Sequence, residues 1–366
     1  MNRLCRTSLL SLTGLAGLGA SGSAAAEPYI AVRTGYQCTV CHVNPSGGGL
    51  RTTFGDIYSQ TLMPQQQLDL GDRGIWLGNV NDWFRIGSNF RYDYSYTDIP
   101  HQKRTDGFGV DDFRVYAAAE LIRDRLSFYV DEAIAPGAVT NREAYALLWF
   151  GSRRYYVKAG QLYLPYGLRL QDDDSFVRQL TAINFTTPDN GVEFGWQHAA
   201  WSAQLAVTNG TAGAAPGTDQ GKQATGSIVY VQPRWRFGGS YSYNDAQAGK
   251  RELEGLFAGL KTGPVAWLAE GDYVADGSIS PRLRAYAGLL EGNWAFLRGN
   301  NLKLTAEYYK PNIVVEQNQR NRFSIVWEYT PIQFVQTRLG ARRYGGIPQN
   351  DEQNEKVLFA ELNLFF

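Results

Sequence analysis

The feature that most constrains the fold is an alternation of apolar and polar residues that recurs through most of the chain. Within residues 234–243, Trp235 and Phe237 alternate with Arg234 and Arg236. A period of two with one apolar face predicts a β-strand whose two sides meet different surroundings. About sixteen such segments follow one another, each close to the length of a membrane-spanning strand. They lie near residues 83–97, 110–121, 125–134, 143–151, 154–163, 190–198, 200–208, 223–232, 234–244, 251–262, 264–275, 282–296, 301–311, 320–330, 332–344 and 354–366.

The links between these segments alternate between short and long. Tight links occur around Pro233, Gly263 and Pro331, whereas links such as 164–189 are long and polar. Outer-membrane barrels show this rhythm because short periplasmic turns alternate with longer external loops. A soluble β-sandwich, the alternative, has no reason to alternate its links in this way. The sequence therefore predicts an all-β fold, a roughly 16-stranded antiparallel transmembrane β-barrel, over residues 81–366.

Composition and the C-terminus both favour the bacterial outer membrane. Aromatic residues make up 13% of the chain and mean hydropathy is −0.32, so the chain is aromatic-rich without a run long enough for a membrane helix. Leu362, Leu364 and Phe366 face one way on the last segment, and a strand ending on an aromatic residue resembles the signal read by outer-membrane assembly machinery. The net charge is zero, from 35 basic and 35 acidic residues, which gives no indication of a nucleic-acid partner. Outer-membrane lipid is the expected surrounding.

Residues 1–26 have the pattern of a signal peptide for export. Arg3 and Arg6 precede a weakly apolar stretch, and a run of small residues ends at Ala26. Cleavage there would leave two of the three cysteines. One close cysteine pair in an exported chain of this size does not form a disulfide scaffold, so the pair must serve another purpose.

That pair belongs to the sequence Cys38-Thr39-Val40-Cys41-His42, the attachment pattern of c-type haem. The two thiols are spaced to add to the two haem vinyl groups, and His42 would be the proximal iron ligand. A thioredoxin-like redox pair is one alternative, but it requires a βαβ setting. A zinc site is another, but it requires a second pair of ligands. The sequence thus predicts one covalently bound haem c within residues 27–80.

Met63 is the predicted distal iron ligand. It is the single methionine after the initiator, and its pairing with a following proline resembles the distal segment of small soluble cytochromes c. The alternative is an ordinary gap-filling apolar residue. His101 and His198 are poorer candidates, because they fall on an external loop and a periplasmic turn. Arg33 and Arg51 are either partners of the haem propionates or plain exposed arginines.

Two further expectations concern the pore. Residues 27–80 contain few large apolar residues, so the barrel wall is expected to complete the haem pocket, with this segment plugging the periplasmic half of the pore. The loop 164–189 carries the acidic run 172–174, and solvation of this run is favoured over an inward fold that would constrict the pore. The segment 158–167, which runs into the start of this loop, resembles a strand end of phosphate-selective-type porins.

The haem region resembles the fused monohaem cytochrome–porins of the bacterial outer membrane, a family that includes ferrous-iron oxidases. The resemblance rests on Arg33-Thr34-Gly35, on Cys38, Cys41 and His42, and on Phe54-Gly55. It implies an outer-membrane electron conduit between an external donor or acceptor, such as Fe²⁺, and a periplasmic c-type cytochrome. Ferrous-iron:cytochrome oxidoreductase activity would follow from an iron donor. The alternatives are a solute channel with a haem-bearing plug or sensor, and a haem redox enzyme with an open iron site.

Overall fold

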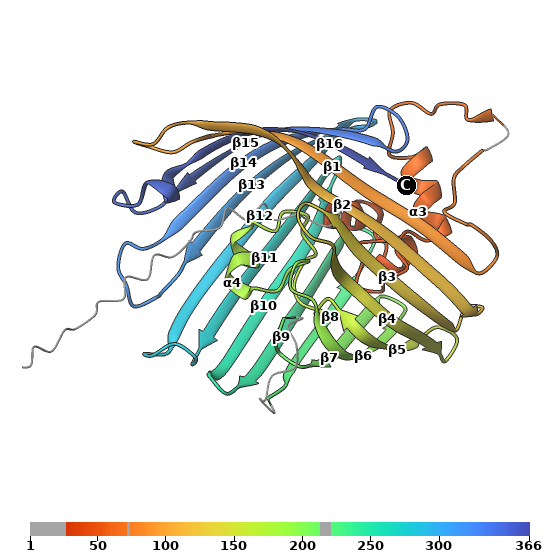
Figure 1. Ribbon diagram of the computed structural model, residues 1–366, viewed down its shortest axis with the longest axis horizontal. Coiled ribbons are helices and arrows are strands. Elements are labelled where there is room, and N and C mark those ends of the chain that lie inside the picture. Colours follow the sequence, from red (N-terminus) through yellow and green to blue (C-terminus); the bar gives the residue numbers. More distant parts are fainter. Residues whose placement is uncertain (1–26, 72–73, 213–220) are drawn as a thin grey trace, which may run out of the picture.

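The computed structural model describes residues 27–71, 74–212 and 221–366, so the predicted signal peptide, residues 1–26, lies outside the described residues. In the described part of the chain, sixteen antiparallel strands pair in sequence order, and β1 closes the barrel by pairing with β16 as well as with β2 (Figure 1). The predicted all-β barrel is confirmed. The strands are β1 Phe84–Asp98, β2 Thr105–Ile122, β3 Leu126–Ala135, β4 Thr140–Phe150, β5 Tyr155–Leu162, β6 Asp189–His198, β7 Trp201–Thr208, β8 Gln223–Val231, β9 Trp235–Ala246, β10 Gly249–Thr262, β11 Val265–Asp276, β12 Leu283–Leu297, β13 Asn300–Lys310, β14 Arg320–Tyr329, β15 Val335–Gly345 and β16 Lys356–Phe365.

Short links gather at one end of the barrel, hereafter the tight-turn end, and most of the long links gather at the other, the long-loop end. The exception is the link between β9 and β10. The predicted segments 234–244 and 251–262 leave residues 245–250 as a longer link, but Ala246 pairs with Gly249, so only residues 247–248 remain outside the two strands. Gly249 has a φ of 138°, a conformation that favours glycine and lets the chain turn at once.

The outer surface of the barrel is apolar and its interior is polar. Trp235 is 41% exposed and Phe237 49% exposed, whereas Arg236 between them is only 7% exposed. The largest fully buried side chains include Arg91, Arg114 and Lys158 from the strands. This arrangement is the reverse of a soluble domain and suits a wall with lipid outside. It excludes the soluble sandwich. No helix in the described residues is both long and apolar enough to cross a membrane.

Three short helices precede the barrel strands: α1 Pro28–Thr34, α2 Cys38–Cys41 and α3 Thr53–Thr61. Helix α1 packs against the inner side of β10 and β11, where Tyr29 and Val32 join one apolar cluster with the wall residues Leu253 and Phe257. Helix α3 lies at the end of the barrel that holds the C-terminus (Figure 1). The segment therefore runs from the lumen to the tight-turn end.

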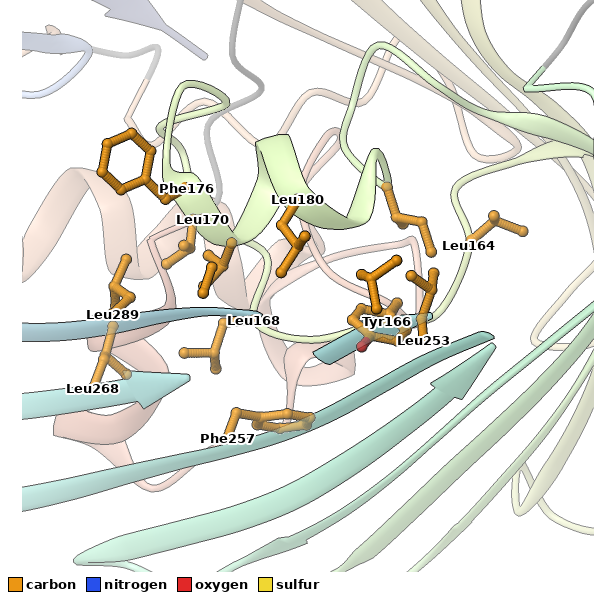
Figure 2. Packing of buried hydrophobic residues seen from close by; sticks show 14 of the residues in the cluster. Leu164, Tyr166, Leu168, Leu170, Phe176, Leu180, Leu253, Phe257, Leu268 and Leu289 are labelled. Atoms are coloured by element: carbon orange, nitrogen blue, oxygen red, sulfur yellow. The ribbon is translucent and has the colours of Figure 1, made fainter. Parts of the chain in front are cut away.

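The long link between β5 and β6, residues 163–188, folds into the lumen and is hereafter the inward loop. It carries α4 Phe176–Thr181. Phe176 and Leu180 are buried against wall residues such as Leu268 and Leu289 (Figure 2). The expectation that the acidic run of this loop is solvated is therefore wrong. The leucines and Phe176 around the run are too apolar to remain in water, and arginines on the opposite wall pair with Asp172.

Candidate functional site

The site is built around α2, which places Cys38, Cys41 and His42 on one side of a single helical turn. The His42 amide donates a hydrogen bond to the Cys38 carbonyl at 2.9 Å, and the Thr52 amide donates one to the Cys41 carbonyl at 3.0 Å. Both cysteines are free thiols and only partly buried. This turn, residues 38–42 and hereafter the thiol turn, thus presents two thiols and one imidazole to the same space.

Gly55 allows α3 to pass close to this turn. A Cβ atom at Gly55 would lie 2.2 Å from the Cys41 carbonyl oxygen, which no side chain tolerates without a backbone shift. This contact gives a physical reason for a glycine in the Phe54-Gly55 pair. The two helices are also joined by Thr52, whose hydroxyl donates to the Val40 carbonyl at 2.6 Å.

Substitution of Gly55 should therefore loosen the thiol turn. We expect Gly55→Ala to destabilise the segment by about 1–3 kcal/mol, the usual cost of overpacking. The measurement is the rate of proteolytic cleavage within residues 27–80, which should rise. Thr53→Ala, at an exposed position of the same helix, is the matched control and should leave the rate unchanged. Equal rates for both variants would contradict this packing account.

The barrel wall holds the segment between Cys41 and α3 by buried hydrogen bonds. The Asn44 amide donates to a carboxylate oxygen of Glu143 at 2.6 Å, and the Leu50 amide donates to the Tyr129 hydroxyl at 3.3 Å. Gln204 donates to the Ser46 hydroxyl at 3.0 Å. Because these partners lie on β3, β4 and β7, the wall fixes the position of the thiol turn.

The thiol turn lines a cavity with an empty volume of about 1550 Å³, part of it open to solvent. Met63 lines the same cavity, a position that the predicted role of distal ligand needs. His101 and His198 do not line it: His101 is exposed beside Asp351, and His198 is exposed at a tight turn. Further lining residues come from α1 and α3, from the inward loop and from wall strands, the last two supplying Tyr166, Leu168, Val229 and Phe257.

His42 is held in its neutral form. Burial lowers its pKa most, and the nearby Arg51 guanidinium lowers it further, to about 4, despite the opposing effect of the Gly48 and Gly49 carbonyls. A neutral imidazole is the form that ligates a metal. The Nδ1 atom of His42 is buried without a hydrogen-bond partner in the described structure.

The cavity has an excess of positive charge. Arg51, Arg169 and Arg236 line it, and none of them has a carboxylate within ion-pair distance among the described residues. Among the lining residues that the structure describes, Glu27 is the single acidic one, and it is already paired with Lys303 at 3.1 Å. The side chain of Arg33, the other arginine expected to bind a propionate, does not line the cavity; it donates instead to Asn301 at 3.0 Å. Sequence reasoning missed Arg169 and Arg236.

A cluster of buried ion pairs separates this cavity from a second one that opens toward the long-loop end. Glu27 and Arg338 line both cavities. Lys303 pairs with Glu27 at 3.1 Å and with Glu328 at 3.0 Å, while Arg338 pairs with Glu27 and, at 2.9 Å, with Glu361. The N-terminal end of α1 therefore crosses the lumen between the two spaces.

The second cavity, hereafter the outer vestibule, is bounded in part by Asp172 of the inward loop. Burial opposes the charge on Asp172, but the Arg322 and Arg342 guanidiniums, at 2.8 and 3.1 Å, outweigh burial and hold its pKa down at about 2. Because folding lowers this pKa, the Asp172 carboxylate stabilises the folded form at pH values above 3.8, the ordinary pKa of an aspartate. This stabilisation is lost as the pH falls through about 2. The loop contact therefore persists throughout the neutral and mildly acidic range.

Removing this charge should release the loop. We expect Asp172→Asn to speed backbone hydrogen exchange in residues 171–183 at neutral pH, because the buried Arg322 and the partly exposed Arg342 lose their shared carboxylate. Glu316→Gln, at an exposed residue of another loop, is the control. Exchange that stays as slow as in the unaltered protein would show that apolar packing of α4 alone holds the loop.

Comparisons with known proteins show the fold. No protein-family model matches the chain, and no curated protein matches it. Solved structures do: an OmpT of Vibrio cholerae with loop L8 deleted has a TM-score of 0.61 at 10% identity, covering 78% of this chain and 100% of that one. An anion-selective porin from Comamonas acidovorans has a TM-score of 0.60 at 9% identity, covering 77% and 99%. The outer-membrane channel DcaP of Acinetobacter baumannii has a TM-score of 0.58 at 13% identity, covering 77% and 97%.

The chain has a porin-like fold. With the apolar outer face of the strands, this places it in the bacterial outer membrane. Sequence identities this low support a similarity of fold alone. The function of the lumen must therefore be argued from the residues that line it. In the described residues the strands are all antiparallel, which removes the setting of a thioredoxin-like pair. No group of three or more potential metal ligands is present there either, which disfavours the zinc site.

Proposed function

We propose that this porin-like barrel holds one haem c, bound covalently through Cys38 and Cys41 with His42 as an iron ligand, and that it conducts single electrons across the outer membrane. The partners would be an external donor or acceptor, such as a metal ion, and a periplasmic c-type cytochrome. The observation that carries the proposal is the cavity itself, which brings two free thiols and a neutral imidazole together with unpaired arginines.

The chemistry of the cavity fits a haem better than the alternatives. A haem brings two carboxylates, and the arginines, of which Arg236 is buried and Arg51 and Arg169 are half-buried, would otherwise lack a counter-charge, a costly state. Its flat apolar ring suits walls formed by residues such as Leu168, Val229 and Phe257. The Nδ1 atom of His42 has no hydrogen-bond partner among the described residues, so this ring nitrogen is available to a metal.

When bound, the haem supplies a one-electron redox couple; the chain supplies the rest. His42 stays neutral and available as a ligand, because burial and Arg51 oppose its protonation. The barrel wall excludes lipid, and the Glu27–Lys303–Arg338 cluster limits the passage of water from the outer vestibule. A partner at the tight-turn end would meet α2 and α3, which lie at that end.

Met63 is proposed as the distal ligand, which would distinguish an electron carrier from an enzyme with an open iron site. We expect Met63→Ala to change the visible spectrum of the haem and to lower its reduction potential, because a thioether opposite histidine raises that potential. Leu62→Ala, at the exposed neighbour, is the control and should change neither. An unaltered spectrum in Met63→Ala would remove Met63 from the iron and strengthen the open-site enzyme.

The second candidate is a solute channel with the haem segment as plug or sensor. The fold favours it, because the similar structures include proteins described as a porin and as an outer-membrane channel. The outer vestibule is lined by more carboxylates than cationic side chains, so such a channel would prefer cations. The Glu27–Lys303–Arg338 cluster, hereafter the sealing cluster, argues against a wide open pore in the described structure.

Proteoliposomes decide between these two functions. The purified protein is inserted into vesicles that enclose soluble cytochrome c, and a membrane-impermeant reductant is added outside. Reduction of the enclosed cytochrome, with little leakage of a small enclosed dye, is the expected result. Dye leakage without reduction would overturn the conduit and leave the channel.

A further inference from the structure

The inward loop between β5 and β6 forms one side of the cavity at the thiol turn. Its residues 165–169 all line that cavity. Two of its backbone amides are tied to the wall: the Gly167 amide donates to the Ser240 hydroxyl at 2.9 Å, and the Leu168 amide donates to Glu270 at 3.1 Å. The loop position just after these anchors belongs to Arg169, whose backbone is therefore held in place.

Arg169 has its cationic head fixed but not neutralised. Its guanidinium lies over the ring of Tyr163, with the carbon 4.8 Å from the ring centroid, and 5.5 Å from that of Phe185. Its Nη2 atom is buried without a hydrogen-bond partner. Glu143, with which it interacts electrostatically at longer range, already accepts hydrogen bonds from Asn44 and from the Tyr163 amide.

Arg236 provides a second such cation from the opposite element, the wall strand β9. It is 7% exposed, and its guanidinium donates to the backbone carbonyls of Tyr36, at 2.6 Å, and Ala31, at 3.4 Å. These bonds aim the side chain at the thiol turn but bring no negative charge. Arg51 differs, because the carboxylate of Asp56 acts on it and partly offsets its charge.

We propose that the inward loop is a wall of the haem site and that Arg169, with Arg236, binds the carboxylates of the haem. The inference rests on the proposed haem and extends it to residues on two elements far from the thiol motif. A buried, pre-positioned guanidinium pairs with a carboxylate through charge-assisted hydrogen bonds, often two at once. The loop that narrows the lumen would thereby also orient the ring.

The test is a potentiometric titration of the purified holoprotein and five variants, one of them a control. Arg169→Gln and Arg236→Gln should each make the haem harder to reduce, because loss of a nearby cation favours the more positive oxidised iron. We expect at least a tenfold fall in the reduction equilibrium constant, which is 59 mV for one electron. Arg169→Lys and Arg236→Lys keep the charge and should restore most of the potential.

Arg234→Gln is the matched control, since Arg234 is exposed and lies two residues from Arg236. Shifts no larger than that of Arg234→Gln, with haem fully attached in every variant, would overturn the role of the two arginines while leaving the proposed function intact. Absence of any covalent haem from the unaltered protein would overturn the proposed function itself. Haem content, measured first on each denatured sample, separates the two failures.

Discussion

Replacing Cys38 and Cys41 together by alanine should remove all covalent haem while the barrel still assembles. The two thiols line the cavity and form no disulfide, so no strand pairing depends on them. The measurement is haem staining of the denatured protein on a gel, which should fall to background. Electron transfer into vesicles should be lost with it.

The control for this prediction is the barrel itself. Folded outer-membrane barrels migrate differently from the heated protein on gels, and the double variant should keep this behaviour. His198→Ala, at an exposed histidine of a tight turn, should keep both the haem and the fold. Staining that survives the loss of both thiols would contradict this prediction, because the haem would then be held by other residues.

Deleting residues 27–61 should open the lumen. This change removes α1, α2 and α3 together with Glu27, the residue that joins Lys303 and Arg338 between the two cavities. Because the closed order of β1 to β16 includes no pairing with residues 27–61 in the described part of the chain, the barrel should remain closed. A barrel of this size without a plug leaves an aqueous channel. Single-channel conductance in a planar bilayer should rise severalfold, and electron transfer should cease.

A single substitution should have a smaller effect on conductance than the deletion. Glu27→Ala removes one carboxylate from the sealing cluster and should raise conductance by less than the deletion, because the helices still occupy the lumen. If the deletion leaves conductance unchanged, the inward loop alone closes the pore, and the helical segment has no sealing role.

The barrel was largely predictable from the sequence, because alternation is a local property of each strand. Where the alternation of apolar and polar residues weakens, the predicted strand is shorter than the observed one. Strand β2 begins at Thr105, five residues before the expected start. Gly107 and Gly109 lie opposite the face of Phe108 and leave no polar side chains to alternate with it, and Asp111 and Asp112 stand together before Phe113. The bulge where Arg91 and Tyr92 pair with β2 shifts the register further.

The inward loop was not predictable in this way. Its acidic run looks like a solvated loop until Arg322 and Arg342, more than a hundred residues later, are placed across the lumen. The same holds for Arg169 and Arg236, which read as ordinary polar positions of a loop and a strand. Only closure of the barrel brings them to the cavity of Cys38. The thiol motif, by contrast, is contiguous, and sequence alone identified it.

The measurement that tests the central claim most directly is mass spectrometry of the peptide that contains Cys38 and Cys41. The protein is exported in cells able to mature c-type cytochromes, purified, denatured under reducing conditions and digested. The account predicts a peptide that carries one haem through two thioether bonds and absorbs in the visible range. A peptide with two free thiols would contradict the account and leave a porin-like barrel whose lumen serves another purpose.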